Sequence, residues 1–152
     1  MSQQNVELVK TLQPTDVDLV ELFVGNEAGV QTALNAFPTA AFADDFSVQF
    51  IAADALLLEY RGVEGMVEGW RDWLAAWASY RMVADDFIDA GDEVVVFARI
   101  SGRTARDGVL VEHSPTAIWS IRDGKVVAIR LYLKREEALE AAGLSDQGQA
   151  QP

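Results

Sequence analysis

The clearest pattern in the chain is an apolar stripe between residues 63 and 77. Its members recur at spacings of four, three and four residues and are Met66, Trp70, Trp73 and Trp77, with Val67 and Leu74 widening the stripe. Such spacing places side chains on one face of an α-helix, so the sequence predicts a helix over this segment. Aromatic side chains on one helix face usually pack on a sheet. In a fold that encloses a cavity, the same tryptophans would also form its wall.

After Tyr80 the apolar pattern changes to that of β-strands. The predicted strands cover residues 80–90, 92–104, 109–122 and 125–134. Asp-Gly pairs at 107–108 and 123–124 predict tight turns, and strands joined by tight turns are antiparallel neighbours. The run 94–97 is apolar at every position, which indicates that both faces of this strand are covered. Helices would cover one face, and the other favours a second subunit, so we expect a homodimer formed through the sheet.

The remaining segments predict helices at both ends of the chain and two short strands. The predicted helices cover residues 5–12, a segment that starts with Thr15-Asp16 as its N-cap, 27–36 and 135–143, and the short strands cover 47–51 and 56–60. Pro14 ends the first helix and Gly143 the last. Residues 145–152 offer little to bury, so we expect a disordered tail after one domain of residues 1–144. Helices followed by an antiparallel meander predict an α+β fold.

The composition is that of one globular domain, and it excludes several chemistries. Half of the 152 residues are hydrophobic, and this length is enough for a buried core. There is no cysteine, which excludes disulfides and thiolates, and the one histidine, His113, excludes a multi-histidine metal site within the chain. We expect no metal and no cofactor. The first residues do not resemble a signal peptide, and no apolar run approaches the roughly 18 residues of a membrane span, so a cytoplasmic protein without membrane contact is expected.

Acidic residues outnumber basic ones, but the charge is unevenly distributed. The chain has 12 Lys and Arg and 24 Asp and Glu, for a net charge of −12, which disfavours binding to nucleic acid or anionic lipid. Most of the basic residues lie between Arg99 and Arg135. Either the two halves of the chain neutralise one another across the fold, or the basic half forms a local site for an anionic group.

Five segments share their order and spacing with a known family. They are Tyr60–Gly65, Trp70–Leu74, Ala90–Val96, Ile118–Val127 and Arg135–Leu144. Together they resemble the SnoaL-like branch of the nuclear transport factor 2-like superfamily, over about residues 5–144. The resemblance implies a cone-shaped barrel, often dimeric, with N-terminal helices packed on a curved antiparallel sheet and a pocket between them. Such proteins include isomerases, polyketide cyclases, epoxide hydrolases, dehydratases and non-catalytic binders, so the fold alone assigns no reaction.

The carboxylates that catalytic members use are missing at the matching positions. For a ketosteroid isomerase-like protein, the resemblance places the base near residues 50–51 and the donor carboxyl near Ala117, and none of these is an acid. For an epoxide hydrolase-like protein, Arg99 matches, but Ser101 and Leu131 stand where the two carboxylates would be. Neither catalytic set is therefore complete in this chain.

The polar candidates that remain are Arg99 and His113. Period-two alternation puts Arg99, Ser101 and Arg103 on one face of their strand, and it puts His113 on the same face as Trp119. If these faces point inward, both Arg99 and His113 reach the pocket; otherwise Arg99 is an ion-pair partner and His113 a structural residue. The predicted ligand-binding residues are Tyr60, Trp70, Trp73, Trp77, Ser101, Trp119, Ile129 and Leu131.

Two functions remain open at this point, beside a purely structural dimerisation module. In the first, the protein binds a small, mostly apolar molecule, and Arg99 anchors an anionic group if the ligand has one. In the second, it is an isomerase, cyclase or dehydratase in which His113 is the general acid/base and Arg99 stabilises the developing negative charge.

Overall fold

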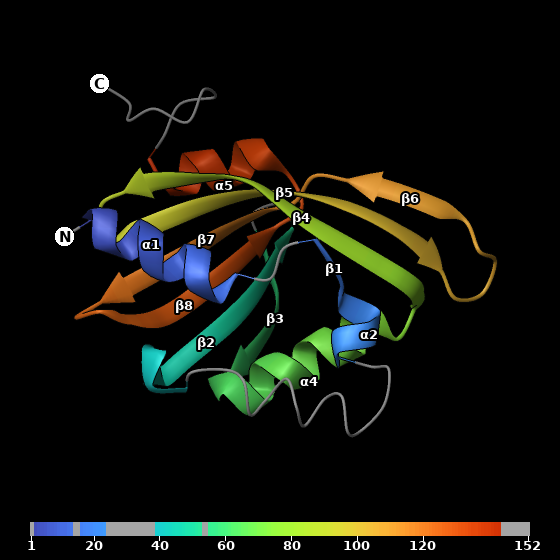
Figure 1. Cartoon of the computed structure of the whole chain (residues 1–152), viewed down its shortest axis with the longest axis horizontal. Helices are drawn as coiled ribbons and strands as arrows, with labels where there is room; N and C mark the ends of the chain where they lie inside the picture. The colour runs from blue at the N-terminus through green and yellow to red at the C-terminus, as the bar shows by residue number, and fades with distance from the viewer. Residues whose placement is uncertain (1, 14–15, 24–38, 53–54, 144–152) are drawn as a thin grey trace.

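The computed structural model describes residues 2–13, 16–23, 39–52 and 55–143 (Figure 1). The helices are α1 (Ser2–Leu12), α2 (Leu19–Phe23), α4 (Gly62–Leu74) and α5 (Arg135–Ala141), with a 3-10 turn at Thr39–Ala41. The strands are β1 (Val17–Asp18), β2 (Phe42–Ala52), β3 (Ala55–Arg61), β4 (Trp77–Ala90), β5 (Glu93–Thr104), β6 (Leu110–His113), β7 (Thr116–Arg122) and β8 (Lys125–Tyr132). The predicted α+β class is confirmed. The helix expected at 27–36 and the tail at 145–152 lie outside the described residues.

All strands belong to one curved sheet with the order β1-β4-β5-β7-β8-β2-β3, and β6 pairs with β5 beside β7. The meander of β4, β5, β7 and β8 is antiparallel, as the turn signals predict. The pairing of β2 with β8 is parallel, which the sequence pattern did not predict. In the described residues the sheet has ends at β1 and β3, so it forms an open cone rather than a closed barrel.

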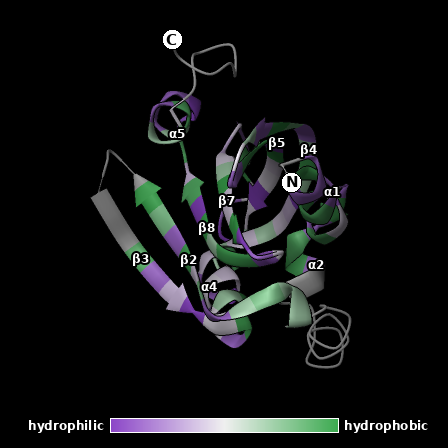
Figure 2. Ribbon diagram, turned by 90° about the vertical axis from the view of Figure 1, so that its left-hand side faces the viewer, coloured by the Kyte–Doolittle hydropathy of each residue, from purple (hydrophilic) through white to green (hydrophobic). Residues whose placement is uncertain are grey.

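The two faces of the sheet are buried by different helices (Figure 2). On the concave face, α1, α2 and α4 cover two clusters of buried side chains, one around Phe46 and Trp119 and the other around Leu74 and Tyr80. On the outer face, α5 covers a third cluster that includes Leu139. The core of the protein is therefore shared between a large inner layer and a smaller outer one.

The double-sided burial of β5 is explained within the chain. Val94 and Val96 belong to the inner cluster, whereas Val95 and Phe97 pack on the outer face with the Leu139 side chain of α5. A second subunit is not needed to cover this strand. The homodimer therefore stays a prediction, and the apolar run 94–97 no longer supports it.

The predicted tryptophan helix is shorter than its apolar stripe. α4 ends at Leu74, and Trp77 is the first residue of β4 instead of the last member of the helix face. The reason lies in β5, where a Cβ at Gly102 would be 2.8 Å from the Trp77 ring and 2.9 Å from the carbonyl oxygen of Ser79. Because Gly102 has no side chain, the Trp77 ring packs directly on the β5 backbone, and this contact holds it in the sheet.

The helix start expected at Thr15-Asp16 is also displaced. Asp16 has a positive φ of 56°, and residues 17–18 form the short strand β1 before α2 begins at Leu19. The capping oxygen belongs to Asp18, whose Oδ1 accepts hydrogen bonds from the backbone N–H groups of Val20 (2.9 Å) and Tyr80 (3.0 Å). One carboxylate thus joins the start of α2 to β4.

The strand expected at 109–122 is interrupted in the middle. β6 ends at His113 and β7 begins at Thr116, with Ser114 and Pro115 between them. Proline has no N–H group to donate to the sheet, although the Pro115 carbonyl oxygen still accepts a hydrogen bond from the Ala98 N–H at 3.1 Å. The interruption places His113 at the end of β6, beside β5.

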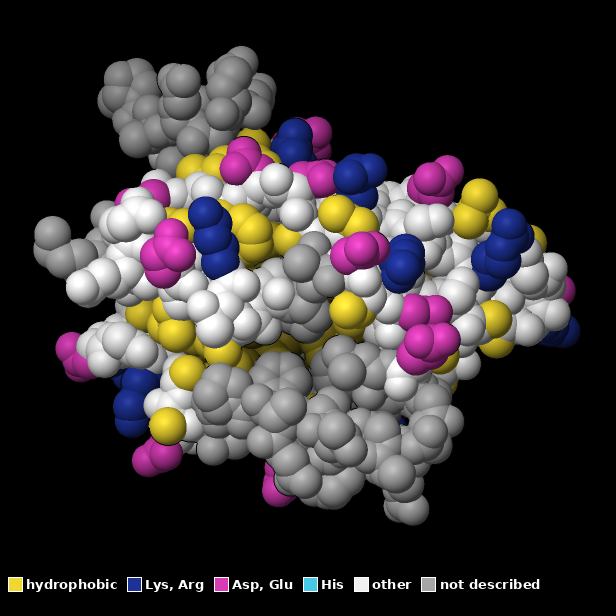
Figure 3. Space-filling model, in the orientation of Figure 1, with side chains coloured by type: hydrophobic (Ala, Val, Ile, Leu, Met, Phe, Trp, Pro, Cys, Tyr) yellow, Lys and Arg dark blue, Asp and Glu magenta, His cyan; other side chains and the backbone are white. Residues whose placement is uncertain are grey.

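Acidic and basic side chains are interspersed over the face of the molecule that Figure 3 shows. Arginines of the basic half pair with carboxylates that precede them in the chain: Arg99 with Asp85, Arg122 with Asp45 and Arg130 with Glu93. These pairs support the interpretation in which the two halves neutralise one another. Within the described ranges, no helix is long and apolar enough to cross a membrane.

Candidate functional site

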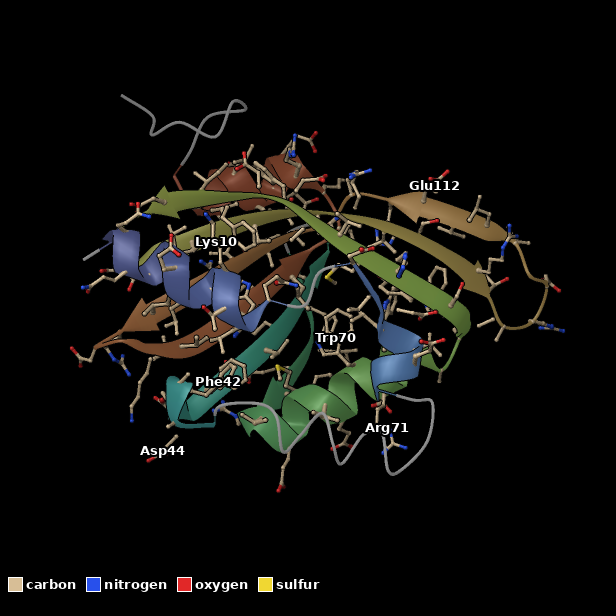
Figure 4. The ribbon with its side chains drawn as sticks, viewed as in Figure 1. Lys10, Phe42, Asp44, Trp70, Arg71 and Glu112 are labelled. Carbon is tan, nitrogen blue, oxygen red and sulfur yellow. The ribbon has the colours of Figure 1, made fainter. Side chains whose placement is uncertain are left out.

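A cavity of about 290 Å³ lies between α4 and the concave face of the sheet. It borders both inner clusters, because its wall includes Trp119 and Ile129 from one and Tyr80 and Met82 from the other. Trp70 rises from α4 toward the sheet and packs against both clusters (Figure 4). The cavity therefore lies between the sheet and the helix, with Trp70 on its wall.

Small residues lie on both sides of the cavity. On the sheet, Ala98 and Ala117 line the wall where neighbouring positions carry large side chains. On α4, a Cβ at Gly69 would lie 2.6 Å from the Tyr60 ring, so the helix and this ring are in direct contact. Tyr60 in turn packs edge-on against Phe50 of the cavity wall, with ring centroids 6.0 Å apart. The aromatic side chains thus support the wall from behind.

One pair of polar side chains faces this largely apolar space. The Tyr80 hydroxyl and His113 Nε2 are 3.2 Å apart, and both residues line the cavity. Tyr80 extends from β4 and His113 from β6, and both strands pair with β5, which brings the two residues together. The tyrosine is almost fully buried, and the imidazole is half-buried.

Burial keeps both members of this pair uncharged at neutral pH. Loss of hydration raises the pKa of Tyr80 to about 12 and lowers the pKa of His113 below its ordinary 6.5. A phenol and a neutral imidazole can each donate or accept a hydrogen bond, depending on the tautomer. The pair therefore offers the cavity a neutral, two-way hydrogen-bonding group.

Arg99 does not reach the cavity, and the prediction that places it there is wrong. Its Nε donates to the Asp85 carboxylate at 2.7 Å, its side chain is 65% exposed, and it lines a shallow depression on the outer face. The alternation expected along β5 is present, but Ala98 and Ile100 are the residues that face inward. Ser101 lines the outer depression with Arg99, so it is not a cavity residue either.

Five of the predicted ligand-binding residues do line the cavity. They are Trp70, Trp73, Trp119, Ile129 and Leu131. Tyr60 stands behind the wall, where its hydroxyl donates to Asp72 at 3.2 Å, and Trp77 packs on Gly102 away from the cavity. Tyr80, which sequence reasoning did not select, is the main polar addition. Tyr80 lies two residues before Met82, which is buried, and residues two apart on a strand point to the same face. This spacing is the one feature of the sequence that could have placed Tyr80 on the inner face.

Two further polar atoms are buried at the cavity wall. Thr116 Oγ1 and Trp119 Nε1 are inaccessible and have no hydrogen-bond partner in the described part of the chain. Both side chains are almost completely enclosed. They are packed within the wall and do not project polar groups into the open space.

The sequence of this chain matches a model of the SnoaL-like domain over residues 27–129. The chain belongs to the SnoaL-like family. This finding confirms the resemblance that the sequence segments indicated. The curved sheet, the helices on its concave face and the cavity between them are the features that the resemblance implies.

Solved structures with the same fold cover nearly the whole SnoaL-like chain. A protein from Jannaschia sp. CCS1 described as a SnoaL-like polyketide cyclase is 19% identical, with a TM-score of 0.59, over 99% of this chain and 94% of that one. A nuclear transport factor 2-like protein from Burkholderia xenovorans LB400 is 21% identical, with a TM-score of 0.57, over 93% and 97%. TerC, co-crystallized with polyporic acid, is 18% identical, with a TM-score of 0.58, over 91% and 98%. At these identities the likeness concerns the fold alone, and the sequence matches no curated protein.

The acidic side chains of this SnoaL-like domain do not gather into a metal site in the ranges that the structure describes. No group of three or more His, Asp or Glu residues there could hold an ion. Asp72 is the carboxylate that the structure places on the cavity wall, and it is exposed and accepts the Tyr60 hydrogen bond. The hydrogen-bonded pair that faces the cavity in the described wall is therefore Tyr80 and His113.

Proposed function

We propose that this SnoaL-like protein binds a small, mostly apolar molecule in the cavity between α4 and the sheet. The observation that carries the proposal is the cavity itself, about 290 Å³ in volume and walled mainly by aromatic and aliphatic side chains. Ligand sites are typically concave, apolar spaces of about 300–1,000 Å³ with a few polar groups. Burial of ligand surface there contributes about 25 cal/mol for each Å² of apolar area.

The wall is already assembled by packing within the chain. Trp70 lies edge-on to Phe50 with ring centroids 6.0 Å apart, and Trp73 lies edge-on to Tyr80 at 6.3 Å. Rings held in this way lose little further entropy when a ligand enters. The relative TerC, which was co-crystallized with polyporic acid, has the same fold, and this is consistent with binding of an organic molecule here.

A thermal-shift panel of cyclic ketones, aromatic alcohols and hydrophobic carboxylates tests the proposal. A ligand that binds only the folded state raises Tm, by about 2–4 °C for each kcal/mol that it adds to the free energy of unfolding. We expect hits among the neutral compounds. Arg99→Ala is the control: it removes the exposed pair with Asp85 and should leave every ligand-induced shift unchanged. A panel without a hit, or hits that disappear in Arg99→Ala, would contradict binding in this cavity.

A second function is favoured by the contact between His113 and Tyr80. If the ligand displaces the mutual hydrogen bond, the Tyr80 hydroxyl donates to a ligand carbonyl oxygen, and Nε2 of the neutral imidazole is free to take a proton from the adjacent carbon. The proton would return from the imidazolium to carbon or oxygen, as in an isomerase. Tyr80 then has the role that the sequence assigned to Arg99.

Deuterium uptake by 2-tetralone in D₂O distinguishes this enzyme from a simple binder. We expect uptake to be faster with the wild-type protein than without it, and His113→Gln to abolish the acceleration. Because burial lowers the pKa of His113, the imidazole stays an effective base until the pH falls below 6.5, and the acceleration should decline only there. Equal uptake with and without the protein would indicate a simple binder and not an enzyme. Acceleration that persists in His113→Gln would exclude this residue as the base.

A further inference from the structure

No cationic side chain is available to the cavity. The polar side chains on its wall are Gln13, Trp70, Asp72, Trp73, Tyr80, His113, Thr116, Trp119 and Tyr132. Every Lys and Arg of the sequence lies in the described ranges, and none of them lines the cavity. The segments outside those ranges contain no Lys, Arg or His, so they cannot add a basic side chain.

An anionic ligand group would therefore be buried without a counter-charge. Such burial is costly, because the ion loses its hydration and gains no ion pair. In the ligand-free protein His113 is not a ready counter-charge, because burial lowers its pKa below the ordinary 6.5. Asp72 and the net charge of −12 oppose an anion further.

A neutral hydroxyl or carbonyl, by contrast, fits the Tyr80–His113 pair in either tautomer. If His113 Nε2–H donates to the Tyr80 oxygen, the tyrosine O–H is free to donate to a ligand oxygen. If the Tyr80 O–H donates to Nε2 instead, the tyrosine oxygen, which also accepts from Trp73, can accept from a ligand hydroxyl through its remaining lone pair. One more hydrogen bond from a buried pair typically adds about 0.5–1.5 kcal/mol.

The other polar side chains of the wall are less suited to this role. Gln13 Nε2 lies 3.1 Å from the Met82 sulfur, and Asp72 accepts from Tyr60. Thr116 Oγ1 and Trp119 Nε1 are inaccessible. The Tyr132 hydroxyl lies 3.5 Å from Arg130 Nη1, and the Trp73 side chain hydrogen-bonds to Tyr80. The Tyr80–His113 pair is thus the polar pair on the described wall that can both donate to a ligand and accept from it.

We propose that the ligand is an uncharged apolar molecule whose hydroxyl or carbonyl group binds the Tyr80–His113 pair. This inference rests on the proposed function and names its ligand class. It departs from the earlier expectation of an anionic group held by Arg99, which lies on the outer face.

Three probes with one ring system test the inference: naphthalene, 2-naphthol and 2-naphthoate, with dissociation constants measured by calorimetry at neutral pH. We expect 2-naphthol to bind about 3–10-fold more tightly than naphthalene, the factor that one hydrogen bond provides. The anion 2-naphthoate should bind more weakly than naphthalene. Tyr80→Phe should remove the advantage of 2-naphthol and leave naphthalene binding unchanged, while Arg99→Ala should change none of the three.

Each other outcome has its own meaning. Failure of all three probes to bind overturns the proposed function and this inference with it. Equal binding of naphthalene and 2-naphthol, or an advantage that persists in Tyr80→Phe, leaves the binder standing but overturns the role of the pair. Tightest binding by 2-naphthoate overturns the claim that the ligand is uncharged.

A measurement on the wild-type protein covers the case in which Tyr80→Phe does not fold. His113 is the one histidine of the chain, so its imidazole nitrogen resonances need no assignment. They should shift on addition of 2-naphthol and stay in place with naphthalene at equal occupancy. No shift with bound 2-naphthol overturns the inference.

Discussion

Ala117→Phe is expected to weaken ligand binding at least tenfold while the protein stays folded. Ala117 lies on β7 between Val96 and Leu131 of the neighbouring strands, is 8% exposed and lines the cavity. A phenylalanine ring at this position would occupy the space that a ligand needs. Overpacking of a full core costs about 1–3 kcal/mol, but here the ring enters open volume. We therefore expect at least a tenfold loss of affinity, about 1.4 kcal/mol, with little change in Tm.

The matched control is Ala105→Phe, in the exposed turn between β5 and β6. It makes the same chemical change far from the cavity and should preserve both affinity and Tm. Calorimetric titration of 2-naphthol into the two variants gives the comparison. Undiminished affinity in a folded Ala117→Phe protein would mean that the probe binds somewhere other than this cavity.

Leu74→Ala is expected to lower the free energy of unfolding by about 2–5 kcal/mol, the range for a leucine truncated in a packed core. Leu74 is 0% exposed and is the last residue of α4. It belongs to the cluster that joins α4 to Leu19 of α2 and to Tyr80 of β4. Its loss would leave a void where the helix meets the sheet. Urea unfolding followed by tryptophan fluorescence measures the change.

Leu110→Ala makes the same substitution where the side chain is 48% exposed, at the start of β6. Surface changes of this kind usually stay within about 0.5 kcal/mol. If the two variants lose similar stability, α4 is not held to the sheet by the packing described above. A large loss of stability in Leu74→Ala, with little loss in Leu110→Ala, supports the conclusion that this packing holds α4 to the sheet.

Local sequence patterns predicted most of the elements of this fold. The Asp-Gly pair at 123–124 marks the β7–β8 hairpin, with positive φ at both residues, and Gly143 follows the last helix with φ of 73°. These signals work because each depends on the conformation of a few adjacent residues. The tryptophan stripe predicted α4 for the same reason, but it could not show that Trp77 leaves the helix to pack on Gly102.

The site was less predictable, because alternation along a strand does not say which face is inside. Arg99 and Ser101 do share a face of β5, as expected, but it is the outer face, where Asp85 binds Arg99. A shift of one residue in orientation exchanges the two faces completely. The direction is decided by the packing of Ala98 and Ile100 against the α4 side of the fold, which is a long-range property.

The Tyr80–His113 pair was beyond local reasoning for a related cause. The two residues are 33 positions apart in the chain and meet because β4 and β6 flank the same end of β5. The sequence shows a strand beginning near Tyr80 and a histidine among apolar neighbours. Neither pattern contains the register that brings the hydroxyl and the imidazole within hydrogen-bond distance.

The parallel pairing of β2 with β8 has a consequence for how the protein is made. It joins residue 48 to residue 129, and apart from this seam β2 has only the β3 hairpin as a sheet neighbour. Contacts between such distant positions form slowly, since a long loop must close first. During synthesis, β2, β3 and α4 would leave the ribosome long before their place in the sheet exists. The cavity can therefore close only after β8 has been translated, and until then its apolar wall would be exposed on the nascent chain and prone to aggregation.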